Sequence, residues 1–180
     1  MSTSLRDNKT RRLCLDALLV AFAMLLSYLE AILPLTAWIP MPGFRLGLAN
    51  VAVVIAFCLI SPVDAALISA VRIFAMGLLF GSATSLYFSA MGGLLSYLIL
   101  WVLSGCGKRL SFLGVSVLCA AAHNCGQILA AVTLFGPSLL ISYLPVLLLA
   151  SILCGGATGI LLNLLIPRLQ SLAGKREVSG

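Results

Sequence analysis

Long apolar stretches with almost no charge are the feature that most constrains what this chain can fold into. The stretches at 84–103, 110–135 and 139–165 contain no acidic residue, lysine or arginine. An α-helix needs roughly 20 such residues to cross a bilayer. Charged residues make up only 9% of the chain, against roughly a quarter in a soluble domain. We therefore expect an all-α integral membrane protein, because the strand-like alternation that a β-barrel requires is absent from the sequence.

The apolar stretches divide into about six transmembrane helices within one membrane domain at 1–180. The segment Ser61-Pro62-Val63-Asp64 predicts a helix start, with serine as N-cap, proline in the first turn and aspartate at the third position. That pattern gives Asp64 a structural role. The expected helices are about Arg12–Leu33, Leu46–Ile60, Pro62–Leu79, Thr84–Leu103, Leu110–Phe135 and Leu139–Leu165.

Positive charges gather on one side of this expected bundle. Cytoplasmic segments of membrane proteins carry an excess of lysine and arginine. We therefore expect the basic segment 1–11 and the tail 169–180 to be cytoplasmic, in a multi-pass protein of the cytoplasmic membrane. Membrane topology then explains the net charge of +6 and disfavours a nucleic-acid partner. The cations on the inner side are Arg6, Lys9, Arg11, Arg12, Lys108, Arg109, Arg168, Lys175 and Arg176, which leaves only Arg45 and Arg72 elsewhere.

The stretch Pro34–Asn50 is the longest interruption of the apolar pattern. It contains Pro34, Pro40 and Pro42, and proline removes a backbone donor and restricts the residue before it, so the stretch cannot be plain helix. Glu30 precedes it and Arg45 lies within it. A structured loop with charges at its edges, between two apolar helices, predicts a lid over a binding site on the outer side.

Polar residues inside the predicted spans concentrate in the outer half, beneath this loop. A charge in mid-helix costs at least about 2.5–3.5 kcal/mol on insertion scales, so such groups normally face a cavity or a partner. One interpretation is a substrate pocket, and the other is an ion pair of Glu30 with an arginine plus hydrogen bonds between helices. His123, Asn124 and Gln127 are expected to share one helix face. The candidate substrate-binding residues are Glu30, Arg45, Asn50, Arg72, Tyr87, His123, Asn124, Gln127 and Tyr143.

Catalytic chemistry finds no support in the sequence. There is no G-x-x-x-x-G-K-[ST] phosphate loop, and one histidine without nearby acids disfavours a metal site. The acidic residues are scattered and form no paired-aspartate cluster that could hold magnesium against a diphosphate. We therefore expect neither a catalytic residue, nor a cofactor, nor a bound metal. The acidic residues are Asp7, Asp16, Glu30, Asp64 and Glu177.

Three motifs carry a resemblance to a known family. They are L-G-L-A-N at 46–50, R-I-F-A-M-G-L-L-F-G at 72–81 and A-H-N-C-G-Q at 122–127. With this order and spacing, the chain resembles the bacterial Gx transporter family, also labelled heptaprenyl diphosphate synthase component I, over about Leu13–Leu165. That family is in turn similar to the substrate-binding S components of energy-coupling factor (ECF) transporters, which are six-helix membrane proteins.

The resemblance implies a vitamin- or micronutrient-type pocket on the outer side, closed in part by the loop between the first two helices. It also implies docking on a membrane coupling subunit driven by two ATPases. Ala17 and Ala21 match the A-x-x-x-A spacing that S components use for that docking. The synthase label implies an alternative role, as a non-catalytic membrane component associated with heptaprenyl diphosphate and isoprenoid-quinone synthesis.

Overall fold

The structure is a computed structural model that describes residues 3–32, 45–105 and 111–177. Within these ranges, side chains are described except at 3–8, 138–144 and 171–177. The elements are all α-helices in the described part, which confirms the predicted all-α class. They are α1 (Thr3–Ile32), α2 (Asn50–Leu59), α3 (Pro62–Phe80), α4 (Ala83–Gly105), α5 (Phe112–Phe135) and α6 (Ser138–Glu177).

Five of these helices contain segments that are long and apolar enough to cross a membrane, so the chain is membrane-embedded. In the described residues these segments are Lys9–Ile32, Pro62–Phe80, Ala83–Gly105, Phe112–Phe135 and Pro145–Gln170. α2 has only 10 residues, which is about 15 Å of helix, half of the roughly 30 Å hydrocarbon thickness. The second expected helix is therefore present but shorter than predicted.

α2 is the centre of the bundle. It packs against α1, α3, α4 and α6, and all six residues from Val51 to Ala56 are buried. A helix that is apolar on every side is stable only when neighbours surround it. It begins at Asn50 rather than at the expected Leu46 because Gly47 has a φ of 82°, which lies outside the helical region.

Serine side chains cap the starts of α3, α4 and α5. The Ser61 hydroxyl accepts a hydrogen bond from the Asp64 amide at 3.2 Å, with Pro62 in the first turn, which confirms the predicted start of α3. Ser82 accepts from the Ser85 amide at 3.2 Å. Ser111 accepts from the Gly114 amide at 3.1 Å. These bonds satisfy backbone donors that a helix end would otherwise leave unpaired inside an apolar protein.

Glycines allow three helices to approach closely. A Cβ added at Gly126 of α5 would lie 2.4 Å from the Met91 carbonyl oxygen of α4. Added at Gly155 or Gly159 of α6, it would lie 2.7 Å from Val117 Cα or 2.6 Å from Leu113 Cα of α5. Helices in membranes associate through such small residues because van der Waals packing replaces the hydrophobic effect there.

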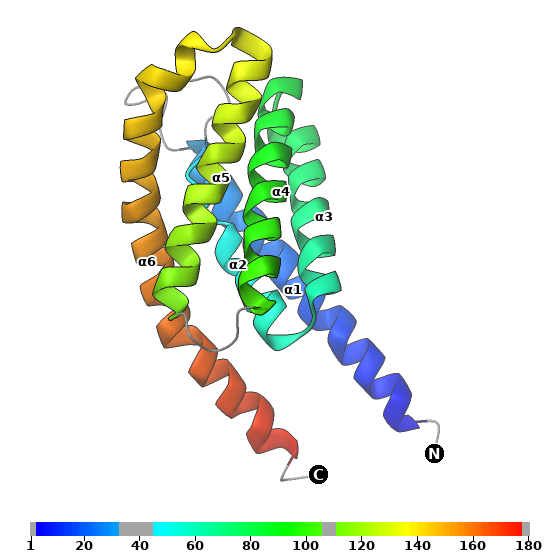
Figure 1. Cartoon of the computed structure of the whole chain (residues 1–180). Coiled ribbons are helices and arrows are strands. Elements are labelled where there is room, and N and C mark those ends of the chain that lie inside the picture. The colour runs from blue at the N-terminus through cyan, green and yellow to red at the C-terminus, as the bar shows by residue number, and fades with distance from the viewer. Residues whose placement is uncertain (1–2, 33–44, 106–110, 178–180) are drawn as a thin grey trace.

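Figure 1 shows α3, α4, α5 and α6 side by side, with α1 crossing at an angle and α2 between them. The start of α1 and the end of α6 lie at the same end of the bundle, and the turns α3–α4 and α5–α6 lie at the other (Figure 1). The basic segment 1–11 is mostly part of α1, and the tail from residue 169 continues α6 to Glu177. Both helices are longer than predicted. Segment 1–11 contains no proline or glycine that would end a helix, and α6 continues past Pro167.

Candidate functional site

Gln127 of α5 fixes the segment that leads into α2. Its amide oxygen accepts from the Arg45 backbone N–H at 3.3 Å, and its amide nitrogen donates to the Arg45 carbonyl at 2.8 Å. Gln127 has no exposed surface. A buried side-chain amide that pairs with the backbone N–H and C=O of one residue satisfies four polar groups that water cannot reach. This part of the loop is therefore held by the bundle.

His123 extends this network toward α2 and α4. Its Nε2 lies 2.7 Å from Gln127 Nε2, and its Nδ1 lies 3.3 Å from Asn50 Nδ2. Asn50 Nδ2 also donates to the Ser96 hydroxyl at 3.3 Å. The imidazole lies between two glycines, because a Cβ would come within 3.1 Å of the ring at Gly47 and within 2.7 Å at Gly92. The L-G-L-A-N and A-H-N-C-G-Q motifs thus meet through Asn50, His123 and Gln127.

Glu30 and Arg72 are both buried, with 3% and 4% of their surfaces exposed. Glu30 Oε1 accepts from the Leu48 amide, next to the start of α2, where a negative charge also complements the helix dipole. Arg72 Nη1 donates to the Ser27 hydroxyl at 3.4 Å. Glu30 Oε2 and Arg72 Nε and Nη2 have no hydrogen-bond partner. The predicted alternative of a direct Glu30–arginine ion pair is not seen among the described residues, where the ion pair found joins Arg12 to Asp64.

Arg45 and Tyr87 lie closer to the end of the bundle opposite the chain ends. Arg45 Nη2 donates to the Ser85 hydroxyl at 3.2 Å. Burial lowers the pKa of the Arg45 guanidinium, and the charge of Glu30 raises it. The Tyr87 hydroxyl lies 3.2 Å from that of Thr133, so it links the start of α4 to the end of α5.

Asn124 has hydrogen-bond partners on α6, and none that joins it to His123 or Gln127 is found among the described residues. Its amide nitrogen donates to the Leu147 carbonyl and to the Ser151 hydroxyl of α6, each at 2.8 Å. One residue of helix turns the side chain by about 100°, which is enough to direct it to a different neighbour. Ala17 and Ala21 are exposed on α1. The side chain of Tyr143 and the loop residues 33–44 lie outside the described residues.

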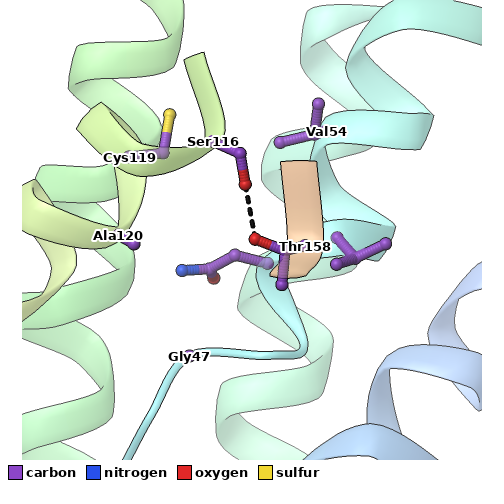
Figure 2. A pocket seen from close by; sticks show the side chains of 8 residues that line it. Gly47, Val54, Ser116, Cys119, Ala120 and Thr158 are labelled. Carbon is purple, nitrogen blue, oxygen red and sulfur yellow. Dashed lines mark hydrogen bonds between the residues drawn. The ribbon is translucent and has the colours of Figure 1, made fainter. Parts of the chain in front are cut away.

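A small cavity lies beside this network, between α2, α5 and α6 (Figure 2). Its volume is about 10 Å³, which is room for one water molecule. The Ser116 and Thr158 hydroxyls bond to each other across its wall (Figure 2). It is too small for a vitamin-sized ligand, since ligand pockets measure about 300–1,000 Å³. The sequence did not predict this cavity, because serine and threonine are common at helix–helix contacts.

A larger groove runs along the outer surface of α3 and α4. Its volume is about 350 Å³. Small, aliphatic and aromatic residues line it, so it is predominantly apolar. The sequence did not predict this groove, because its shape depends on how the small-residue faces of α3 and α4 meet. The lining residues are Ala66, Ser69, Ala70, Ile73, Phe74, Ala90, Gly93, Leu94 and Tyr97.

No group of three or more metal-ligating side chains occurs in the part of the chain that the structure describes. Among known proteins, a family model described as heptaprenyl diphosphate synthase component I matches residues 19–165. The matched region runs from α1 to α6 and includes all three sequence motifs. No curated protein and no solved structure matches the chain.

Proposed function

The chain belongs to the heptaprenyl diphosphate synthase component I family, and we propose that it acts as the substrate-binding membrane subunit of an ECF-type uptake transporter. In this role it captures a small, vitamin- or micronutrient-type molecule from outside. It releases that molecule inward when a coupling subunit and two ATPases reorient it. The protein itself needs no catalytic residue and no cofactor for this task.

One observation carries the proposal. Buried polar side chains from α1, α3, α4 and α5 gather around the segment Arg45–Asn50, in a bundle whose core is predominantly apolar. Glu30, Arg72, His123 and Gln127 are each at least 96% buried, and polar groups at membrane depth usually mark a binding site or a pathway. The cations counted above support an orientation with both chain ends cytoplasmic, which directs this cluster toward the outer half.

The coupling subunit would dock on α1. Ala17 and Ala21 are exposed there, and residues this small let another helix approach closely. We expect Ala17→Trp with Ala21→Trp to prevent co-purification with a membrane coupling protein and its ATPases. Ala157→Trp is the matched control, because Ala157 is also an exposed alanine but lies on α6. Equal recovery of the partners with both variants would refute this docking site.

The decisive experiment is native mass spectrometry of the protein purified in mild detergent. A stoichiometric water-soluble vitamin or cofactor would support the proposal. We expect Arg72→Ala and His123→Ala to lose that molecule while Tyr87→Phe, which changes a half-exposed hydroxyl, loses much less. Folded Arg72→Ala and His123→Ala proteins that retain the molecule unchanged would exclude these two residues from the site.

A second candidate function follows from the family name and from the groove between α3 and α4. The groove is apolar and measures about 350 Å³, so it suits a hydrocarbon chain that enters from the bilayer. In this role the protein is a non-catalytic membrane partner in prenyl diphosphate synthesis. A co-purified prenyl lipid, together with a soluble aspartate-rich prenyl synthase in place of ATPases, would favour this function over uptake.

A further inference from the structure

Two buried charges of opposite sign lie close to each other without forming a pair. Arg72 Nη1 donates to the Ser27 hydroxyl at 3.4 Å, and Ser27 lies one helical turn before Glu30 on the same face of α1. A direct ion pair would compensate both buried charges, yet among the described residues no ion pair joins Glu30 to Arg72. Each charge keeps hydrogen-bonding atoms that have no partner. A second molecule with complementary charges would satisfy these atoms.

The free atoms of Arg72 are one edge of its planar group. Ser27 uses Nη1, and the atoms without partners are Nε and Nη2. Two parallel N–H bonds from one guanidinium edge match the two oxygens of a carboxylate. The same chain shows this arrangement at Arg12, whose Nε and Nη2 donate to the two carboxylate oxygens of Asp64 at 2.8 and 2.7 Å.

Glu30 offers the complementary half. Its Oε1 is used by the Leu48 amide, whereas Oε2 has no partner. A buried carboxylate oxygen calls for a charged donor such as an ammonium group. The other cation near Glu30 is Arg45, whose Nη2 already donates to the Ser85 hydroxyl. The Ser89 hydroxyl of α4 is also unpartnered and buried.

We infer that the substrate is an amino-acid-type zwitterion, with its carboxylate on the Nε–Nη2 edge of Arg72 and its ammonium group on Glu30 Oε2. This inference rests on the proposed function and adds the substrate class. Each of the two buried charges of the protein is then compensated by one charge of the same ligand. A ligand that lacks either charge leaves one of them uncompensated, which is the basis of selectivity.

The first test uses the wild-type protein in detergent and three sets of probes. These are the proteinogenic L-amino acids, the carboxylic acids that lack the amine, and the amines that lack the carboxylate. We expect at least one amino acid to raise the unfolding temperature, and its two singly charged analogues to bind at least tenfold more weakly by calorimetry. Absence of any thermal shift with the amino acids, or equal binding of an analogue, would overturn the inference.

The second test assigns each charge to its residue. Glu30→Gln should weaken binding of the amino acid about 10- to 100-fold, since charge-assisted hydrogen bonds are lost, and should leave binding of the acid without an amine unchanged. Arg72→Lys keeps a positive charge but removes the planar edge, so it should weaken the amino acid and spare the amine. Arg12→Lys makes the same change at the other arginine fork and should leave binding unchanged.

If Glu30→Gln or Arg72→Lys loses all binding because it unfolds, its elution volume will change. The wild-type comparison of the three sets of probes then decides whether the ligand is a zwitterion. Native mass spectrometry distinguishes failure of the zwitterion inference from failure of the proposed uptake function. A retained solute that is neutral or singly charged overturns the zwitterion and leaves the uptake function standing. If the protein retains no solute and no amino acid shifts its unfolding temperature, both fail.

Discussion

Substituting Gly126 by alanine tests how tightly the candidate site depends on contact between α4 and α5. The added Cβ would lie 2.4 Å from the Met91 carbonyl oxygen and 2.8 Å from Gly92 Cα. Both neighbours are backbone atoms, so no side chain can rotate away. Ordinary contact begins at 3.4 Å, and the two helices must therefore separate locally by about 1 Å.

The matched control is Gly156→Ala. Gly156 also lies within a helix, α6, but a Cβ added there meets nothing within 4 Å. Both variants gain the higher helix propensity of alanine, about 1 kcal/mol. Only Gly126→Ala overpacks a helix contact, which typically destabilises a protein by about 1–3 kcal/mol. The difference between the two variants isolates that cost, and for a chain of this size it corresponds to about 2–12 °C in unfolding temperature.

The assay is thermal unfolding of both variants and the wild type in the same detergent, followed by binding of whatever solute the wild type retains. We expect Gly126→Ala to unfold below the wild type and Gly156→Ala at or above it. Gly126→Ala should also bind more weakly, because Gly92 packs directly on the His123 ring. Equal unfolding temperatures for the two variants would refute the close α4–α5 packing.

Three further predictions concern single contacts. Gln127→Leu leaves both backbone groups of Arg45 unpaired, so we expect a loss of about 1–3 kcal/mol, measured as a lower unfolding temperature and as faster hydrogen exchange of the amides at 45–50. Gly47→Ala places a side chain at a φ of 82° and against His123, which should destabilise the protein by at least about 1–2 kcal/mol; an unfolding temperature equal to wild type would contradict the geometry at this residue. Arg12→Met and Asp64→Asn should show a small favourable coupling in a double-mutant cycle, since Arg12 is half-exposed, and the coupling should shrink in high salt.

The sequence predicted the elements of this fold better than their contacts. Apolar stretches of sufficient length indicated the helices, and Ser61-Pro62-Val63-Asp64 correctly predicted the start of α3. The family resemblance is confirmed by the matching family model. These features depend on local composition and spacing, which a linear sequence displays directly.

Contacts between helices were harder to predict because they depend on rotation about each helix axis. Helical spacing grouped Asn124 with His123 and Gln127, but it could not show that the Asn124 amide donates to the Leu147 carbonyl of α6. Glu30 was assigned to an ion pair or a ligand, whereas one of its oxygens holds the backbone at the entry to α2. The assignment of the other candidate residues to substrate binding stays a prediction, to be tested by the bound solute.

The short length of α2 has a consequence for how the topology of this family is deduced. A hydropathy scan counts only the five longer segments, and an odd number of crossings would place the two chain ends on opposite faces of the membrane. In the fold, the start of α1 and the end of α6 lie at the same end of the bundle (Figure 1), so an even count of crossings requires that α2 be included. Reporter fusions at the N-terminus and at the C-terminus should therefore report from the same side of the membrane, and a count of five crossings would assign the wrong orientation to every segment after α1.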